Sequence, residues 1–349
     1  MKFVLLISGE NEALAFSEIK SVAAIFDPAA KIRKARQLII LSSNSIKERE
    51  TMEMQARLAF TRSTGLLLFS CSRKLLNKKI ETFDWASVYS SSFSVRIKGI
   101  SGKESRIALL ERRIGGKIFD ILQAKGIKPR VRLEFPKTEI EFFFLGNTAF
   151  CAKIIAVQKE DFEARAPRYR PGFSPVSMAP KLCRCMVNLS GAAGGETVFD
   201  PFCGTGGILI EAGLMGLKIE GSDIDSEMVE KCRKNLKFFK LPAKISITNA
   251  CKIPVRKDYV VCDLPYGVSS YLSEKKKFLY PKFARALSSF LRKRAVLCIK
   301  KGPDEQLIRK NLKGLFIRES FNYYIHKSMT KKITVIERGK WRRKTKNRR

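Results

Sequence analysis

The pattern of hydrophobic and polar positions changes near the middle of the chain. Before about residue 160, short apolar runs and helical patterns follow one another without a fixed order, whereas from Glu196 onward strand and helix patterns alternate regularly. Regular alternation is typical of a parallel sheet with crossover helices. The sequence therefore predicts an α+β region followed by an α/β domain, and 349 residues are enough for both.

The first part predicts several short strands and three helices. Runs rich in β-branched and aromatic residues predict strands, and apolar residues repeated every three or four positions predict helices. The expected strands are 3–7, 37–41, 66–69, 93–98, 131–135, 138–145 and 149–157. The expected helices lie around 19–26 and 52–60 and in a zone from 107 to 122, interrupted at Gly115 and Gly116.

A stretch rich in arginine and proline, 164–180, separates the two parts. Its four prolines disfavour regular structure, so we interpret it as a linker. Leu182, Cys185, Met186 and Leu189 follow at helical spacing and predict an amphipathic helix that covers the edge of the next domain.

The second part predicts a seven-stranded, doubly wound sheet. A first strand ends at Asp200 and runs through a glycine-rich turn into a helix, and six further strands follow. Those strands are expected at 218–223, 244–248, 259–263, 295–299, 315–324 and 333–337. The later helices are expected around 228–239, 278–291 and 304–312.

The charge of the chain points to a polyanionic partner. The formal net charge is +35, and a basic surface gains affinity for nucleic acid by releasing counterions from phosphates. An anionic membrane surface, or adaptation of a whole proteome, would also account for the excess. The apolar run at 3–7 is too short for a signal peptide or a membrane span, so we expect a soluble protein with no membrane partner.

The nine cysteines and one histidine give no metal-binding pattern. No C-x-x-C pair occurs, and His326 is the single histidine, so no metal site is predicted. We expect reduced, mostly buried thiols and a cytoplasmic location.

The glycine-rich turn from Asp200 to Gly207 predicts a nucleotide-like pocket. Gly204 and Gly206 let the backbone bend sharply at the start of a helix, and Asp223 ends the next strand about twenty residues later. That spacing suits a carboxylate that accepts hydrogen bonds from both hydroxyls of a ribose. A dinucleotide and S-adenosylmethionine both remain possible, although the missing third glycine favours the second. Asp225 is interpreted as a helix N-cap.

Asp263-Leu-Pro-Tyr-Gly267, at the end of the expected strand 259–263, predicts the chemistry. In an open parallel sheet it meets Asp200 and Asp223 in one crevice. Because the lone pair of an exocyclic base amine is delocalised, it needs acceptors that hold its hydrogens and aim it at a methyl group. The Asp263 carboxylate and a main-chain carbonyl near Leu264 or Pro265 fit that role, and Tyr266 would stack on the base.

These two motifs resemble the S-adenosylmethionine-dependent amino-methyltransferases of class I fold with a D/N-P-P-Y motif. The stretches 5–10, 93–97 and 170–190 resemble, more narrowly, the tRNA guanine-10 N2-methyltransferases. That resemblance implies an α/β, class I Rossmann-like methyltransferase preceded by an α+β ferredoxin-like and THUMP RNA-binding region. The implied domains are 1–70 ferredoxin-like, 71–160 THUMP, 161–190 linker and covering helix, 191–339 methyltransferase, and 340–349 basic tail.

The resemblance also implies roles for individual residues. Catalysis falls to Asp263, Pro265 and Tyr266, and the cofactor S-adenosyl-L-methionine to Asp200, Gly204, Gly206, Asp223, Asn249 and Ala250. Two positions depart from the family pattern: Leu264 stands in place of a proline, and Asn249 in place of a common aspartate. We expect the Asn249 amide oxygen to accept from the adenine amino group, with some loss of affinity.

The implied partner is tRNA, held by the basic face of the THUMP-like segment. The RNA-binding candidates there are Arg96, Lys98, Arg112, Arg113, Lys128 and Arg130. A small activating subunit is a possible further partner, and the sequence leaves the oligomeric state and the choice between mono- and dimethylation open.

Three alternatives to guanine N2 methylation of tRNA remain at this point. A DNA adenine N6-methyltransferase shares the catalytic motif but leaves the first part of the chain unexplained. A non-catalytic RNA-binding protein on the same fold conflicts with the intact Asp263 motif. A protein glutamine methyltransferase conflicts with the aspartate and with the positive charge.

Overall fold

The computed structural model describes residues 1–99, 104–175, 177–265 and 270–339, without the side chains of 270–276. The chain forms two compact units. The first contains Met1–Glu12, Phe26–Ala56 and Thr61–Lys159. The second contains Ala13–Ile25, Arg57–Phe60 and the chain from Glu160 onward.

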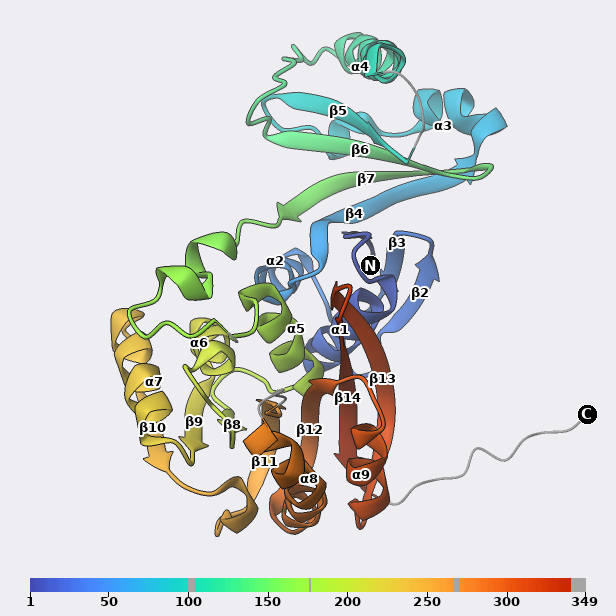
Figure 1. Cartoon of the computed structure of the whole chain (residues 1–349). Coiled ribbons are helices and arrows are strands. Elements are labelled where there is room, and N and C mark those ends of the chain that lie inside the picture. The colour runs from blue at the N-terminus through green and yellow to red at the C-terminus, as the bar shows by residue number, and fades with distance from the viewer. Residues whose placement is uncertain (100–103, 176, 266–269, 340–349) are drawn as a thin grey trace, which may run out of the picture. The chain divides into compact units, whose positions relative to one another are not determined.

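One seven-stranded sheet forms the core of the first unit, in the order β2-β3-β1-β4-β7-β6-β5. Its strands are β1 (Lys2–Ile7), β2 (Lys31–Ala35), β3 (Leu38–Ser42), β4 (Thr61–Ser72), β5 (Phe93–Lys98), β6 (Thr138–Leu145) and β7 (Thr148–Val157). The long strand β4 pairs with β1 on one side and β7 on the other (Figure 1). All neighbouring strands are antiparallel except β5 and β6.

Helices α3 (Leu76–Thr82) and α4 (Glu104–Ala124) pack against part of this sheet, and α2 (Glu48–Arg57) precedes β4. Ile114, Ile118 and Leu122 of α4 pack in a buried cluster with Trp85 and Phe142. The apolar repeat of α4 therefore buries a stripe at helical spacing.

Two expectations for the first unit were wrong. Helix α4 runs without a break through Gly115 and Gly116, because burial of its apolar stripe outweighs a cost of about 1 kcal/mol for each helical glycine. Residues 131–135 form no strand and pair with β5 through one bridge at Val131. Phe135 has a φ of 49° and precedes a proline, which stops the ladder there. Strand β2 and helix α3 were not foreseen.

The second unit contains the predicted seven-stranded sheet, in the order β10-β9-β8-β11-β12-β14-β13. The strands are β8 (Thr197–Asp200), β9 (Lys218–Asp223), β10 (Ala243–Ile247), β11 (Lys257–Asp263), β12 (Leu291–Lys300), β13 (Leu315–His326) and β14 (Met329–Arg338). The first five in this sequence are mutually parallel, and β14 runs antiparallel to its neighbours. The doubly wound α/β fold class is confirmed.

Helices cover both faces of this sheet (Figure 1). α5 (Pro180–Ser190), α6 (Gly207–Leu214) and α7 (Ser226–Phe238) lie on one face, and α8 (Ser270–Phe290) and α9 (Asp304–Asn311) on the other. Tyr280, Phe283 and Leu287 of α8 pack against β11 and β12. The α5 helix is buried almost all round rather than on one face, and the stretch before it contains two short 3-10 turns, Glu163–Arg165 and Pro167–Tyr169.

A buried carboxylate ties helix α1 (Glu12–Phe26) into the second unit. Glu18 is fully buried and accepts hydrogen bonds from the backbone N–H groups of Ala59 (2.8 Å) and Phe60 (3.0 Å) and from the Asn188 side-chain amide (2.8 Å). Burial raises the pKa of Glu18, and these donors oppose the shift. Three donors meeting two acceptor oxygens require a carboxylate at this position.

All nine cysteines are free, and only Cys71 and Cys251 are not fully buried. Within the described residues, no helix combines the length and the apolar character that a membrane crossing requires.

Glu18→Gln should destabilise the second unit. The glutamine NH2 group would face one of the three donors, and an unsatisfied buried donor costs about 1–3 kcal/mol. We expect a lower urea midpoint in circular dichroism. Lys20→Gln, at an exposed position of the same helix, is the control and should leave the midpoint unchanged. Equal midpoints for the two variants would contradict the role of Glu18.

Candidate active site

Three aspartates end three neighbouring parallel strands. Asp200 ends β8, Asp223 ends β9 and Asp263 ends β11. The strand order reverses between β8 and β11, and ligands of open α/β sheets bind at such a point, beyond the carboxyl ends of the strands. The structure thus brings the three predicted acids to one edge of the sheet.

The glycine-rich turn joins β8 to α6 and is fastened to the end of β9. Gly206 is the N-cap of α6 with a φ of 85°, and a Cβ there would lie 2.8 Å from the Cys232 sulfur, so only glycine fits. The backbone N–H of Gly204 donates to the Asp223 carboxylate (2.9 Å). The turn and the second acid therefore form one rigid unit.

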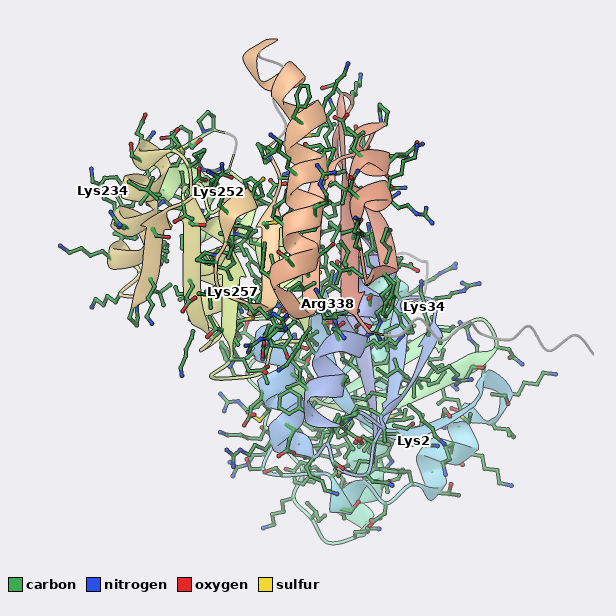
Figure 2. The ribbon with its side chains drawn as sticks, turned by 90° about the horizontal axis from the view of Figure 1, so that it is seen from below. Lys2, Lys34, Lys234, Lys252, Lys257 and Arg338 are labelled. Carbon is green, nitrogen blue, oxygen red and sulfur yellow. The ribbon has the colours of Figure 1, made fainter. Side chains whose placement is uncertain are left out.

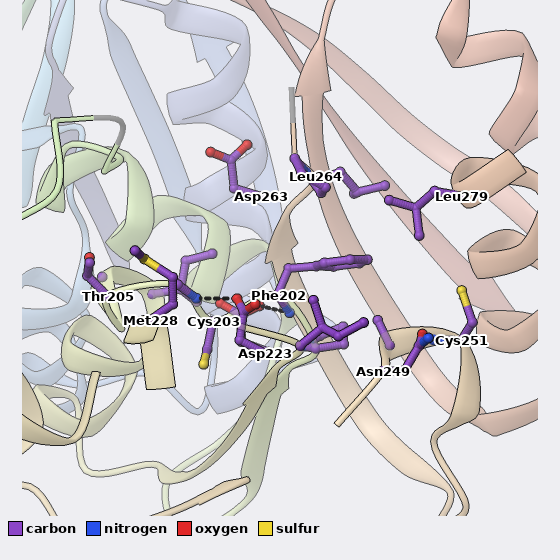
Figure 3. Close-up of a pocket in the computed structure, with 18 of the residues that line it drawn as sticks. Phe202, Cys203, Thr205, Asp223, Met228, Asn249, Cys251, Asp263, Leu264 and Leu279 are labelled. Atoms are coloured by element: carbon purple, nitrogen blue, oxygen red, sulfur yellow. Dashed lines mark hydrogen bonds between the residues drawn. The ribbon is translucent and has the colours of Figure 1, made fainter. Parts of the chain in front are cut away.

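A pocket of about 1060 Å³ lies over these strand ends. Figure 3 shows Asp223, Asn249 and Asp263 around this pocket. Of the predicted cofactor and catalytic residues, those that line it are Asp200, Gly204, Asp223, Asn249, Ala250, Asp263 and Pro265. Gly206 shapes the turn without lining the pocket, and Tyr266 lies outside the described residues.

The burial of the acids affects their protonation. Burial raises the pKa of Asp200 well above its usual range, and its Oδ1 accepts the backbone N–H of Phe202 (3.0 Å). Burial also raises the pKa of Asp263, while the ammonium of Lys331 lowers it. Asp223 is half-buried and accepts backbone N–H groups from Gly204 and Asp225. Each acid is thus held by donors from the chain itself.

The turn after Asp263 is held by two hydrogen bonds. Leu264 donates its backbone N–H to the carbonyl of Cys298 on β12 (2.8 Å), a bond that a proline cannot make. The buried Tyr280 hydroxyl donates to the carbonyl of Pro265 (2.7 Å). The departure from the family's proline therefore adds a tie to the sheet.

Asn249 caps a short 3-10 helix, Ala250–Lys252, at the pocket wall. Its side-chain oxygen accepts the backbone N–H of Cys251 (2.9 Å). That bond uses one lone pair of the oxygen, so the second lone pair and the amide NH2 remain for a ligand. Asp225 caps α7 through the N–H groups of Glu227 and Met228, which confirms its expected role.

The sequence did not reveal Lys331, Tyr280 or the loop before α5. Lys331 of β14 pairs with Asp263, and the hydroxyls of Ser177 and Thr205, which both line the pocket, form a hydrogen bond (2.9 Å). A motif search finds short runs of residues, whereas these contacts join elements far apart in the chain. Among the described residues, no three histidine, cysteine or acidic side chains are placed to hold a metal ion.

The six candidate RNA-binding residues belong to the first unit. They differ in exposure and in whether an acidic side chain lies beside them. Arg112, Arg113, Lys128 and Arg130 are exposed. Arg96 lies 3.7 Å from Glu111, and Lys98 lies 3.8 Å from Glu141. Exposed lysines also occur on the second unit, where Lys234 projects from α7 (Figure 2).

Comparison with known proteins identifies the family. A family model described as an RMKL-like methyltransferase domain matches residues 167–330. A tRNA (guanine(10)-N2)-dimethyltransferase of Methanothermobacter thermautotrophicus is 35% identical over 97% of this chain and 100% of its own length. The chain belongs to the family of tRNA (guanine(10)-N2)-dimethyltransferases. A relative of the same name from Pyrococcus abyssi is 28% identical over 96% of this chain and 99% of its own.

Solved structures agree on the fold. TrmN from Thermus thermophilus covers 97% of this chain and 100% of its own, with a TM-score of 0.55 at 19% identity. At that identity the likeness establishes the class I methyltransferase fold.

Proposed function

We propose that this protein is a tRNA methyltransferase that transfers methyl groups from S-adenosylmethionine to the exocyclic N2 of a guanosine, at position 10. The observation that carries the proposal is the meeting of Asp200, Asp223 and Asp263 around one pocket, in a chain whose full-length relatives carry that name. Those names favour guanine in tRNA, rather than adenine in DNA, as the base that is methylated.

The pocket fits S-adenosylmethionine. Asp223 uses each carboxylate oxygen once, and a carboxylate has about four acceptor sites, so two remain for ribose hydroxyls. Gly204 has no side chain and Ala250 only a methyl group, so a nucleoside could lie close to the backbone at this part of the pocket wall. Asp263 Oδ1 is buried without a hydrogen-bond partner among the described residues. A buried acceptor of this kind is expected where a ligand supplies the donor. When bound, the cofactor supplies a methyl group activated by a sulfonium.

Catalysis by this chain consists of holding the base amine. Oδ1 of Asp263 accepts one N2 hydrogen, which turns the nitrogen lone pair toward the methyl group. We assign the other hydrogen to the Leu264 carbonyl, since the Pro265 carbonyl already uses one of its two lone pairs for the Tyr280 hydroxyl. Transfer of the methyl group would break the S–CH3 bond of the sulfonium, whose electron pair returns to sulfur, and form the N2–CH3 bond. N2 would then be positive and release its proton to the Asp263 carboxylate. Tyr266, which lies outside the described residues, is the expected stacking partner of the base. The base must leave its helix to enter the pocket.

The tRNA is held by the THUMP-like segment, residues 71–160. Arg112 and Arg113 are exposed side by side on α4, and Lys128 and Arg130 follow in the exposed loop after it. Phosphate contacts of this kind fix the position of the RNA without reading its sequence. The basic tail, 340–349, adds to the attraction, and the protein acts in the cytoplasm.

Asp263→Asn should reduce kcat/KM for unmodified tRNA about 10- to 100-fold, because a hydrogen bond to a charged group contributes about 1.5–3 kcal/mol. The assay is transfer of labelled methyl groups to tRNA. Asp225→Asn is the matched control, since asparagine caps helices as well as aspartate does, and it should keep full activity. Undiminished activity of Asp263→Asn would exclude the proposed mechanism.

Asn249→Asp should tighten cofactor binding about two- to tenfold. One carboxylate oxygen would keep the bond to the Cys251 N–H, and the other would accept the adenine amino group. In Asn249 both hydrogen bonds would have to share a single oxygen. Calorimetry with S-adenosylhomocysteine measures the change. Weaker binding than in the parent protein would place the adenine elsewhere.

Arg112→Ala with Arg113→Ala should weaken tRNA binding and lower the slope of log affinity against log salt by about 0.7–0.9 per lost phosphate contact. Filter binding at several salt concentrations gives the slope. Lys234→Ala with Lys237→Ala removes the same exposed charge from α7 and is the control. Equal losses in both double variants would show that overall charge, rather than this helix, binds the RNA.

A further inference from the structure

Lys331 is a buried lysine that faces the catalytic aspartate. Its side chain is 4% exposed, and its ammonium lies 2.5 Å from Oδ2 of Asp263. Lys331 belongs to β14, where it pairs with Lys300 of β12, and β12 separates β14 from β11. The ammonium therefore reaches past an intervening strand to the end of β11.

Stability alone does not account for this pair. Burying an ammonium costs several kcal/mol, and hydrophobic residues of similar volume often replace a buried ion pair without loss of stability. The next residue, Lys332, instead forms its ion pair at the surface with Glu305. The position of Lys331 thus points to a role in the chemistry of Asp263.

The two oxygens of Asp263 have different surroundings. Oδ2 is taken by Lys331, whereas Oδ1 is buried and has no hydrogen-bond partner among the described residues. The pair fixes the carboxylate plane. One oxygen is anchored, and the other is held for the base.

Burial favours protonation of Asp263, whereas the side chains of Lys331 and Cys298 oppose it. The titratable groups that act on it or respond to it come from five elements: Asp200 of β8, Cys183 of α5, Cys298 of β12, Tyr280 of α8 and Lys331 of β14. Burial raises the pKa of Asp263, and the ammonium of Lys331 is the largest influence that lowers it.

The charge of Asp263 decides which base edge it can bind. The Watson–Crick edge of guanine presents two adjacent donors, N1–H and an N2 hydrogen, which suit the two lone pairs of an ionised Oδ1. The corresponding edge of adenine presents one donor and one acceptor, N1, which suit a protonated acid or an amide. A carboxylate facing adenine N1 would meet a lone pair.

We propose that Lys331 is a positioning and specificity-determining residue, which holds Asp263 as an oriented carboxylate and so selects the two-donor edge of guanine. This inference rests on the proposed function. It assigns to β14 a part in base selection that the catalytic motif alone does not contain.

The first test is the pH profile of kcat/KM for Lys331→Met, with Lys331→Arg as the conservative variant and Lys332→Met as the matched control. Asp263 must be ionised to accept, so activity falls below its pKa. Loss of the neighbouring ammonium raises that pKa, and an opposite charge at this distance accounts for about one to three pH units. We expect the acidic limb of Lys331→Met to move upward by that amount, with activity recovering at high pH.

Lys331→Arg and Lys332→Met should keep the parent profile. Binding of S-adenosylhomocysteine, measured by calorimetry, verifies that each variant is folded. A Lys331→Met protein that binds this ligand and loses activity by the same factor at every pH, or loses none, would contradict the inference.

The second test compares tRNA carrying guanine with tRNA carrying 2-aminopurine at the target position. The analogue keeps the amine but has an acceptor at N1, which a carboxylate repels and a protonated acid binds. At neutral pH, the ratio of kcat/KM for 2-aminopurine to that for guanine should rise at least about tenfold in Lys331→Met, since one pKa unit changes the ratio of protonated to ionised acid by that factor.

The ratio is taken within one variant, so partial loss of folded protein cancels. An unchanged ratio would overturn the role of Lys331. The proposed function fails separately, if the parent protein does not methylate guanine in tRNA at all.

Discussion

The parallel pairing of β8, β9 and β11 is the constraint on which the rest of the site depends. Parallel strands end at the same edge of a sheet, so the residues that follow them meet even when they are distant in sequence. Asp200, Asp223 and Asp263 meet in this way. The covering helices then close the two faces and leave the strand ends as the open side.

Gathering three carboxyl groups at one edge carries an electrostatic cost, which the fold offsets differently at each. Asp200 and Asp223 receive backbone N–H groups, which are fixed in place by the turns. Asp263 receives the ammonium of Lys331. Backbone donors hold Asp200 and Asp223 rigidly in place. The ion pair sets a full positive charge beside Asp263, which favours its ionised form.

The sequence predicted the parts of the site that are local in the chain. Acids that directly follow apolar runs, and glycines that directly precede a helix, can be recognised from their positions in the sequence. Contacts between distant elements have no such signal: Lys331 lies 68 positions from Asp263, in a chain with 68 lysines and arginines. Local rules also overstated the glycine pair at 115 and 116, where tertiary burial of α4 prevailed, and the run 131–135, where the backbone turns at Phe135.

Mapping of the methylated nucleosides decides whether this chain methylates guanine N2 in tRNA. Purified protein is incubated with unmodified tRNA and deuterated S-adenosylmethionine, and the methylated nucleosides are mapped by mass spectrometry of nuclease fragments. We expect labelled N2-methyl- or N2,N2-dimethylguanosine at position 10. Label on adenosine, or on guanosine at an atom other than N2, would contradict it.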